Sequence, residues 1–555
     1  MTTGQRNENP MSVVHDYVNA IVRRRREPME PIGFEPDWAD KPRRHKVYRE
    51  ATRFPLPDPP DAPDGENATL DAALRPGPGG EGFSLGTLSR LLRDSYGLLG
   101  RRLGVQANSD EQLLPQYRSA VWWRGTASGG GMYPAEIYWV TGSRGPMLPG
   151  VYYYSAPHHA MQRLLAGDVV DQVRAALGPD GSVPTDQFLL VSLKFWTNAF
   201  KYNSFCYHVV TMDIGTLLGT WQMTSRSQGV SLRPILNFDE LALNRLLGLT
   251  SHAESVFAVV PLPWDAPDTL PEPMAAEPTS PEPAPVAEVN RPRVHLQEEE
   301  RSRRVIRFPQ VEEVHAEILA ADRPRPTAAD LAAAIPAPPP HPAAERLALP
   351  DPAPLRASVP EALRGRRSSF GRFSAHRPLT RAELSALLIA GTAGGRLVSD
   401  VKDESGGPGL TRLAVFTNHV EGIARGGYDY DPTRHELGVV TPGDPALFLQ
   451  RNYFLPNYNL EQVAAVLVVL ARPEAVLEVA GPRGYRFVNA EVGAVAQAVY
   501  TASAALDIGC GAALGFDNVS YAERLGIEGT GEWPLLILMV GRERPGEPNI
   551  DHRIA

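Results

Sequence analysis

The sequence of 555 residues predicts an α+β fold that occurs twice in the chain. At about 150 residues per domain, this length has room for two to four domains. Two blocks, 40–265 and 355–548, each mix the helical period of apolar residues with short apolar runs of strand length. Such a mixture is typical of helices and strands packed together. A proline-rich segment between the blocks, and residues that align from one block to the other, support the duplication.

The elements expected in the two blocks follow one order. The first block predicts a helix near Leu88–Leu92, a strand at Ile137–Val140 and a long helix from Met212 to about Gln228. The second predicts a helix from Thr380, a strand at Leu413–Thr417 and a long helix from about Ala490 to Leu506.

Proline marks the division between the blocks, because 22 of the 53 prolines lie between Pro261 and Pro360. Such a segment cannot hold a central strand or a long helix, so an extended linker is expected. Val311–Ala321 lacks proline and has helical spacing, which leaves a short docked helix and disorder both open. The predicted organisation is an N-terminal polar segment at 1–39, a first domain at 40–265, a linker at 266–354, a second domain at 355–548 and a tail at 549–555.

Composition excludes several classes of function. Net charge is −9 and the compact basic block is confined to Arg23–Arg26, so nucleic acid is not an expected partner. The longest apolar runs, such as Pro534–Val540, fall well short of the roughly 18 residues of a membrane helix. The first residues lack the pattern of a secretory signal, and two cysteines cannot form a disulfide framework. We therefore expect a cytoplasmic protein without a membrane segment.

Three sets of residues form an internal repeat. Gly150, Tyr152, Tyr154, His159, Gly167 and Asp168 align without gaps on Gly426, Tyr428, Tyr430, His435, Gly443 and Asp444. Ser128-Gly129-Gly130 matches Ser405-Gly406-Gly407, and Tyr207, Asp213 and Gly215 match Tyr485, Glu491 and Gly493. Their common order predicts that the two copies pack as a pseudo-twofold pair within one chain, like a fused homodimer.

The second block carries a family resemblance. Arg366–Phe373, followed by a helix, resembles the opening of flavin-dependent nitroreductase-like proteins. Arg483–Arg486 before the long helix, and Val540–Arg542 at the end of the last strand, strengthen that likeness. The resemblance implies an α+β fold that binds FMN between two units, so the fold class becomes tandem nitroreductase-like domains forming an intrachain pseudo-dimer.

The first block resembles a narrower group, the azoline dehydrogenases of ribosomally made peptide natural products (the SagB/ThcOx type). Ala127–Pro134, the hairpin at Gly150 and the pair Lys201-Tyr202 carry this likeness. One departure is Ala127, where a proline usually precedes the serine. The resemblance covers most of both blocks and none of the linker.

By this resemblance, one half should hold the FMN phosphate. The second half keeps Arg367 and Ser369 at Arg-x-Ser spacing, with Arg542 and Arg544 after its last strand. Arginine forks suit phosphate because they donate in pairs and stay charged. The family's second arginine falls at Gly371, so the neighbouring Arg372 is the candidate replacement. The matching segment of the first half, 74–79, lacks the serine, and its last strand has no basic residue after it.

The loop before the long helix shows the opposite pattern. Lys201-Tyr202 of the first half aligns with Val479-Ala480 of the second. In the azoline dehydrogenases that the first half resembles, the Lys-Tyr pair lies over the flavin. The cradle of one half and the Lys-Tyr loop of the other belong to the same composite site, which predicts one FMN per chain.

The chemistry implied for this site turns a thiazoline or oxazoline into an azole. One hydrogen leaves as a proton and the other as a hydride to flavin N5, while the protein supplies positioning and a base. Lys201 or Tyr202 is the candidate base, and a lysine would need a pKa lowered to roughly 7–8. Ser128, Gly129 and Gly130 would let the backbone approach the flavin ring, because glycine removes the steric barrier.

Three hypotheses stay open at the level of sequence. The first is an FMN-dependent azoline dehydrogenase that works beside a cyclodehydratase on a precursor peptide. The second is an NAD(P)H-dependent nitroreductase-like oxidoreductase for small molecules. The third is a flavin-free scaffold that binds the peptide or the cyclodehydratase. No metal site is expected, since His158, His159 and His208 lack partners at metal-ligand spacing. A homo-oligomer is compatible with each hypothesis.

Overall fold

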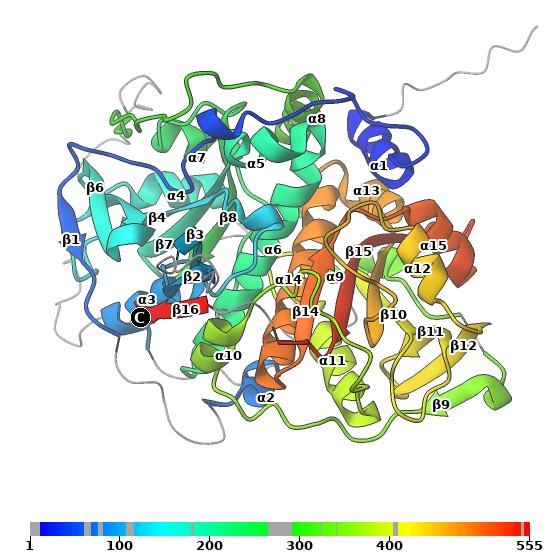
Figure 1. The fold of residues 1–555 in the computed structure, drawn as a ribbon. Coiled ribbons are helices and arrows are strands. Elements are labelled where there is room, and N and C mark those ends of the chain that lie inside the picture. Colours follow the sequence, from blue (N-terminus) through cyan, green and yellow to red (C-terminus); the bar gives the residue numbers. More distant parts are fainter. Residues whose placement is uncertain are drawn as a thin grey trace, which may run out of the picture.

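Two α+β halves lie side by side in the computed structural model, and their longest helices, α6 (Cys206–Arg226) and α14 (Gly484–Ala505), meet in the middle (Figure 1). The α+β class and its tandem occurrence are therefore confirmed. The structure describes residues 12–59, 68–75, 82–106, 116–178, 183–264, 291–321, 324–339, 341–402, 409–545 and 549–554.

An antiparallel sheet of order β1-β6-β5-β4-β7-β8 forms the first half. Its strands are β1 (Arg53–Pro55), β4 (Ala135–Thr141), β5 (Gly150–Ser155), β6 (Ala160–Ala166), β7 (Gln187–Lys194) and β8 (Glu254–Pro261). Its helices besides α6 are α2 (Leu70–Ala73), α3 (Leu85–Ser95), α4 (Val170–Leu177), α5 (Phe195–Tyr202) and α7 (Glu240–Leu246). Both faces of the sheet are covered, because Trp139 belongs to the core with α6 and Tyr138 to the core with α4 and α7. Ser84 caps α3, because its side chain accepts a hydrogen bond from the Thr87 N–H.

The second half repeats this plan with the order β14-β15-β13-β10-β11-β12-β9. Its strands are β9 (Arg346–Ala348), β10 (Thr411–Thr417), β11 (Gly426–Asp431), β12 (Glu436–Pro442), β13 (Ala465–Ala471), β14 (Gly509–Ala513) and β15 (Trp533–Gly541). Its helices besides α14 are α10 (Val359–Gly365), α11 (Arg381–Gly394), α12 (Ala446–Arg451), α13 (Pro473–Ala480) and α15 (Asn518–Leu525). Thr380 begins α11 with a reciprocal capping box to Glu383.

The long helices pack with the reciprocity expected of a pseudo-twofold axis. A methyl group on Gly215 of α6 would come within 1.8 Å of the carbonyl oxygen of Ala490, and one on Gly493 of α14 within 1.9 Å of that of Met212. Gly215 and Gly493 are aligned in the repeat, and Met212 and Ala490 stand at the same offset. Only glycine permits so close a backbone approach, so the duplicated glycine fixes how the halves meet.

The two halves also share a local hydrogen-bond pattern at aligned residues of the repeat. His159 and His435 both have positive φ, 44° and 54°, at the turn after β5 and after β11. Tyr154 and His159 are joined by a 3.0 Å hydrogen bond, and Tyr430 and His435 by one of 2.8 Å. The other ring nitrogen of each histidine lies within 2.8 Å of a serine hydroxyl on α3 or α11. Part of the predicted Ser-Gly-Gly match, Ser405–Gly407, lies outside the described residues.

The linker and the N-terminal segment are packed onto the halves where the structure describes them. Residues 291–308 form neither helix nor strand, and Glu298 and Glu300 bind Lys194 at 2.7 and 2.6 Å. The helix considered for Val311–Ala321 is present as α8 (Pro309–Ala320), and α9 (Ala328–Leu331) follows it. At the N-terminus, α1 (Val13–Arg23) buries an apolar face against α8, α13 and α15.

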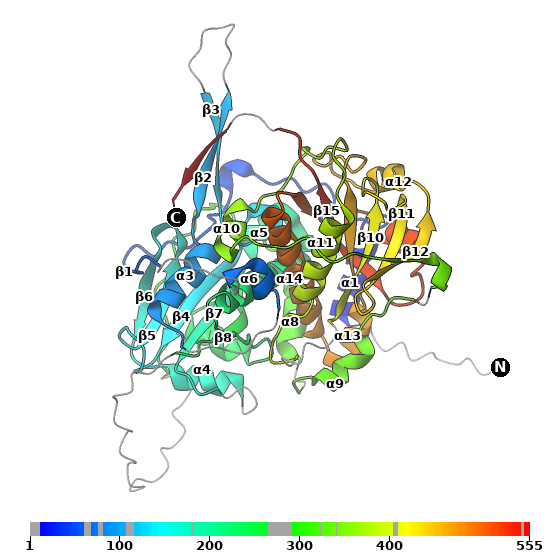
Figure 2. The same ribbon diagram turned by 90° about the horizontal axis from the view of Figure 1, so that it is seen from below.

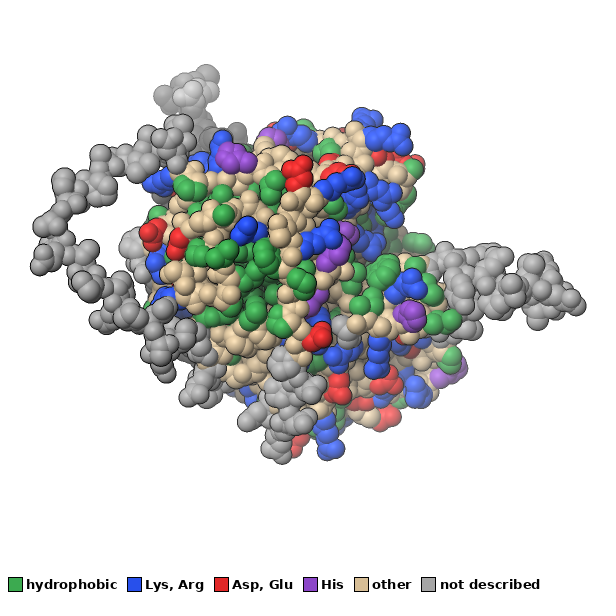
Figure 3. Space-filling view, turned by 90° about the vertical axis from the view of Figure 1, so that its left-hand side faces the viewer, with side chains coloured by type: hydrophobic (Ala, Val, Ile, Leu, Met, Phe, Trp, Pro, Cys, Tyr) green, Lys and Arg blue, Asp and Glu red, His purple; other side chains and the backbone are tan. Residues whose placement is uncertain are grey.

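A third sheet projects from the first half as an arm (Figure 2). It consists of β2 (Gly100–Gln106), β3 (Gln116–Trp123) and the C-terminal β16 (Asn549–Arg553), in the order β16-β2-β3. The predicted tail at 549–555 thus supplies a strand to the first half. In the part of the chain that is described, no helix is both long and apolar enough to cross a membrane. The face shown in Figure 3 mixes hydrophobic, basic and acidic side chains.

Candidate functional site

A glycine-rich loop between β3 and β4 forms the first part of the candidate site. Asp213 on α6 holds this loop, because its carboxylate accepts hydrogen bonds from Ser128 Oγ at 2.7 Å and from the Gly129 backbone N–H at 2.8 Å. Ser128 Oγ also accepts from the backbone N–H of Tyr133 at 2.8 Å. Gly130 has φ 62° and ψ 12°, a left-handed conformation that favours glycine. The loop is therefore fixed by α6 beneath it.

Lys201 and Tyr202 lie directly against this loop. A methyl group on Gly130 would come within 2.6 Å of both Lys201 Nζ and the Tyr202 hydroxyl. Both side chains come from the last turn of α5, just before α6 begins, and Lys201 Nζ lies 5.1 Å from the centre of the Tyr202 ring. The structure thus brings together all five residues that the sequence assigned to the first half: Ser128, Gly129, Gly130, Lys201 and Tyr202.

The environment shifts the pKa values of these groups in different directions. Burial lowers the pKa of Lys201, and the nearby positive charge of Arg44 lowers it further. Burial raises the pKa of Tyr202, with added contributions from Asp213 and Tyr453. Burial also raises the pKa of Asp213 to about 7, although its hydrogen bonds from Gly129 and Ser128 oppose the shift. Lys201 loses its proton more easily than an exposed lysine, whereas Tyr202 keeps its proton more firmly.

Residues of the second half form hydrogen bonds to the backbone of the segment that precedes this loop. Gln497 of α14 accepts a hydrogen bond from the Ala127 N–H at 2.8 Å and donates one to the Gly125 carbonyl oxygen at 3.1 Å. Arg366 donates to the carbonyl oxygens of Gly125 at 2.8 Å and Arg124 at 3.0 Å. The loop of one half is consequently positioned by the other half.

A cavity of about 400 Å³ lies in the second half, between the end of α10, the end of α14 and β14. Four residues of the predicted phosphate cradle line it: Arg367, Ser369, Arg372 and Arg544. Arg377 adds a further guanidinium. Arg542, which the sequence also assigned to the cradle, lies elsewhere. Its side chain pairs with Glu383 on α11 and donates to the carbonyl oxygen of Asp507 at 3.2 Å.

Glu543 occupies the middle of the cradle. Its carboxylate binds Arg367 at 2.6 Å and Arg372 at 3.4 Å. Burial acts to raise the pKa of Glu543, but the contacts with Ser369 and Arg367 outweigh burial and hold that pKa below its usual range. The carboxylate therefore occupies the acceptor position for two of the guanidinium groups, although Nε of Arg372 is buried without a hydrogen-bond partner.

Tyrosines of the second half lie between the cradle and the Lys-Tyr pair. Tyr500 lines the cavity, and its hydroxyl oxygen accepts a 2.8 Å hydrogen bond from the backbone N–H of Ala512. Tyr458 is buried, and its ring lies 6.1 Å from that of Tyr453. Tyr453 is close enough to Tyr202 to raise its pKa. A row of tyrosine side chains therefore leads from the cavity beside Arg367 toward Tyr202 and the glycine-rich loop.

Sequence reasoning missed several of these residues. No contact was predicted for the arginine run at Arg23–Arg26, but Arg24 lies 4.8 Å over the ring of Phe205 and donates to Asn518 at 2.8 Å. Tyr453 and Tyr458 follow no motif, since they come from an irregular segment after α12. A usable signal existed for Asp213, because the repeat aligns it with another acid, Glu491.

The pseudo-equivalent cradle of the first half is smaller and lacks its strand. A cavity of about 200 Å³ lies there, lined by Arg75, Arg226 and Arg396 among others. Arg226 of α6 aligns with Ala504 of α14 at the same sequence offset that aligns Gly215 with Gly493, and Ala504 lines the larger cavity. Where the second half has β14, the first half keeps one isolated bridge, Ile235–Val259. Pro234 precedes that bridge, and proline cannot donate to a strand ladder.

The pseudo-equivalent loop site has also changed. Glu491 accepts a hydrogen bond from the Leu410 N–H at 2.6 Å, as Asp213 does from Gly129, and also pairs with Lys402 at 3.3 Å. Both charged residues line a mostly apolar cavity of about 420 Å³. The linker helix α9 forms one wall of this cavity through Ala328 and Leu331. The Val479-Ala480 pair is apolar and carries no group that could take a proton.

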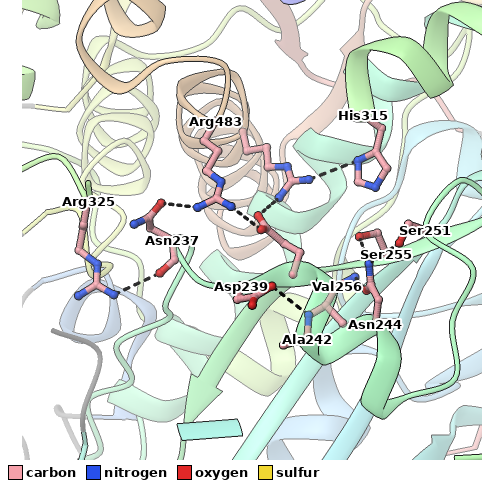
Figure 4. A network of polar contacts seen from close by, with 12 residues as sticks. Asn237, Asp239, Ala242, Asn244, Ser251, Ser255, Val256, His315, Arg325 and Arg483 are labelled. Carbon is pink, nitrogen blue, oxygen red and sulfur yellow. Dashed lines mark hydrogen bonds and ion pairs between the residues drawn. The ribbon is translucent and has the colours of Figure 1, made fainter. Parts of the chain in front are cut away.

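A buried polar network fastens the linker to both halves near this second site (Figure 4). Glu240 at the start of α7 binds Arg483 at 2.6 Å and Arg486 at 2.7 Å, both from the start of α14. Arg486 lies 3.3 Å from His315 Nδ1 of α8. Arg325 donates to the carbonyl oxygen of Asn237 at 3.1 Å. Arg483–Arg486, which carried part of the family resemblance, thus serve as interface residues.

Comparisons with known proteins agree with this architecture. Residues 363–542 match the model of the Nitroreductase family. A protein of Methanocaldococcus jannaschii assigned as a nitroreductase is 33% identical over 178 residues, which are 30% of this chain and 82% of that protein. A crystal structure of a protein from Anabaena variabilis, also assigned as a nitroreductase, superposes with a TM-score of 0.68 at 22% identity, covering 96% of this chain and 100% of that chain.

The fold is that of a tandem protein, in which each half carries one α+β unit. The chain belongs to the nitroreductase family. The match to the Anabaena structure extends over both halves and the linker, so the nitroreductase fold accounts for most of the chain. Family membership indicates an oxidoreductase.

Proposed function

We propose that this protein is an FMN-dependent dehydrogenase that oxidises thiazoline or oxazoline rings to azoles in a ribosomally made peptide. One observation carries the proposal: Lys201 and the Tyr202 hydroxyl converge on Gly130 in a loop that the second half positions. A half-buried lysine beside an open backbone suits removal of a proton from a carbon acid that is held against a planar cofactor. The first half's resemblance to azoline dehydrogenases points to the substrate.

The residues of the cradle fit the phosphate of FMN. Arg367, Arg372 and Arg544 converge on a cavity of about 400 Å³, and Arg372 Nε is buried without a partner. Phosphate would replace the carboxylate of Glu543 as the acceptor for these guanidinium groups. The bound flavin would supply the hydride acceptor, which no side chain of this chain can provide. Arg542 is no part of this proposal, because it pairs with Glu383 outside the cavity.

Within the proposed reaction, Lys201 is the better base. A base must be deprotonated at working pH, and the pKa of Lys201 is lowered while that of Tyr202 is raised. Lys201 would take the proton from the azoline carbon, and Tyr202 would orient the ring as a hydrogen-bond donor. Tyr202 lies against Phe205 at 6.4 Å between ring centres, which keeps water from one side of the site.

The decisive experiment combines flavin content with turnover. Purified full-length protein should carry about one FMN per chain, and it should oxidise an azoline-bearing peptide with a loss of two hydrogens per ring by mass spectrometry. Oxygen is the proposed electron acceptor, and a cyclodehydratase acting in the cytoplasm is the proposed partner that supplies the azoline. Protein that remains colourless with added FMN would contradict the proposal and favour a binding scaffold.

A second candidate is an NAD(P)H-dependent reductase of small molecules. The observation in its favour is the 33% identity, over 178 residues, with a protein assigned as a nitroreductase. The two candidates differ in their reductant. Rapid bleaching of the flavin by NADPH, together with no change in the azoline peptide, would support the reductase and contradict the dehydrogenase.

A further inference from the structure

The arm formed by β16, β2 and β3 has a free edge. In the order β16-β2-β3, β3 pairs with β2 on one side and with no strand of the described chain on the other. An exposed edge strand presents unpaired N–H and C=O groups, and natural proteins usually shorten or protect such edges. Here β3 spans eight residues and stands away from the body (Figure 2).

The base of the arm exposes apolar side chains as well. The side chains of Val121 and Trp122 are 53% and 40% exposed, and Ile550 on β16 is 42% exposed. Large apolar groups at this density on a projecting sheet are a sign of an interaction surface. The edge and the two exposed side chains of β3 together fit an added strand, whose main chain pairs with β3 while its side chains meet Val121 on one face of the sheet and Trp122 on the other.

The strands of the arm are basic, in contrast to the whole chain. They contain four arginines and one aspartate, a net charge of +3, whereas the chain carries −9. The connection at 107–115 carries Asp110 and Glu111, so the positive charge belongs to the strands. Asp551 is paired with Arg102 at 2.7 Å, but Arg101 stacks over Trp122 and its buried Nε has no hydrogen-bond partner. Acidic side chains of an added strand would complement this charge.

The arm is also continuous with the candidate site. β3 ends at Trp123 and the chain runs through Arg124 and Ala127 directly into Ser128. On the other side of the sheet, Arg102 lowers the pKa of Asp551, and the charge of Arg367 in the cradle contributes to the shift. A strand on β3 would therefore lead toward the loop that Lys201 contacts.

From these observations we propose that the outer edge of β3 binds an extended, acidic peptide segment by strand addition. The inference deepens the proposed function, on which it rests in taking the segment to be a non-reacting part of the peptide substrate. A second copy of this chain is the competing occupant, because two free edges could also pair with each other.

Binding is tested apart from turnover. The probe is a fluorescein-labelled twelve-residue peptide of alternating Glu and Val, followed by fluorescence anisotropy on the full-length protein. We expect saturable binding, no binding when alternate backbone nitrogens of the peptide are methylated, and much weaker binding when Lys replaces Glu. Equal affinity for the methylated peptide would overturn strand addition, and equal affinity for the Lys peptide would overturn the charge argument.

Protein variants locate the site. Arg101→Glu should weaken binding of the acidic peptide roughly three- to tenfold, because the attraction by a half-buried arginine becomes a repulsion. Arg434→Glu, an exposed arginine in the second half's β11–β12 turn, is the matched control and should not change binding. Equal effects of both variants would overturn the assignment to the arm. A dimer in sedimentation that Arg101→Glu dissolves would identify a second copy as the occupant. A failure of azoline oxidation alone would leave the binding result intact.

Discussion

The side-chain oxygen of Gln497 accepts a 2.8 Å hydrogen bond from the backbone N–H of Ala127, across the interface between the two halves. Ala127 immediately precedes the Ser128–Gly130 loop, and Gln497 lies in the middle of α14. A helix of one half thereby fixes the loop that faces the Lys-Tyr pair of the other. In a duplicated chain this contact makes the geometry of the Ser128–Gly130 loop depend on correct packing of both copies.

Replacing Gln497 should uncouple the halves at this loop. Gln497→Ala leaves the Ala127 N–H without its partner, and an unsatisfied buried group costs about 1–3 kcal/mol. It also removes one of the two donors to the Gly125 carbonyl oxygen, which keeps Arg366. We expect a lower free energy of unfolding in urea and slower turnover. Gln228→Ala at the end of α6 is the control, because its amide bonds only its own helix. Equal loss of stability in both variants would contradict the interface role.

The buried carboxyl of Asp213 should make stability depend on pH. Its pKa is raised by burial to about 7, above the 3.8 of an exposed aspartate. The folded state therefore binds more protons than the unfolded state between these values, and the free energy of unfolding should fall as pH rises from about 4 to 7. Each pKa unit is worth ~1.4 kcal/mol. Asp213→Asn should flatten this slope, and an unchanged slope would contradict the assignment.

Removing the charge of Glu543 should tighten flavin binding. The carboxylate pairs with Arg367 and Arg372, so it competes with phosphate for the same guanidinium groups. Glu543→Gln should lower the Kd of FMN, measured by flavin fluorescence quenching, by roughly tenfold, the worth of about 1.4 kcal/mol. Glu523→Gln, which removes the exposed pair with Arg26, should leave the Kd unchanged. Weaker FMN binding by Glu543→Gln would mean that the carboxylate organises the cradle instead.

The asymmetry between the two cradles predicts one flavin per chain. Arg367→Ala should reduce FMN retention on gel filtration, because it removes a guanidinium from the larger cavity. Arg75→Ala changes only the smaller cavity of the first half and should retain FMN. Two flavins per chain, or equal flavin loss in both variants, would reverse the assignment.

Lys201 and Tyr202 should affect chemistry without affecting flavin binding, because they belong to the half without the phosphate cradle. Lys201→Ala and Tyr202→Phe should keep FMN and slow azoline oxidation, with a loss of ~10²–10⁴-fold for the base. The rate of the unchanged protein should rise with pH as Lys201 loses its proton, and Lys201→Ala should lack that rise. Val479→Ala is the control at the aligned position. Full activity in both the Lys201 and the Tyr202 variant would contradict a role in chemistry and would mean that the pair only packs in its loop.

Local sequence predicted much of the fold because the signals were periodic or repeated. Thr380 caps a helix at the predicted start, and the apolar run Pro534–Val540 lies in strand β15, since capping and apolar runs act over a few residues. The arm was not predicted. Its strand β16 comes from the last residues of the chain and pairs with β2 more than 400 positions earlier, a partnership without a local signal.

The sequence by itself determined the duplication, the family and which residues could carry chemistry, because glycines, arginines and a Lys-Tyr pair at matching offsets need no three-dimensional information to be recognised. Only the tertiary structure decided how those residues combine. It placed Lys201 and Tyr202 on Gly130, turned Arg542 toward Glu383, and put Glu543 into the cradle. Side-chain direction after a strand, and burial between two halves, are set by packing across distant segments. Spacing along the chain therefore identified the candidates, and packing selected among them.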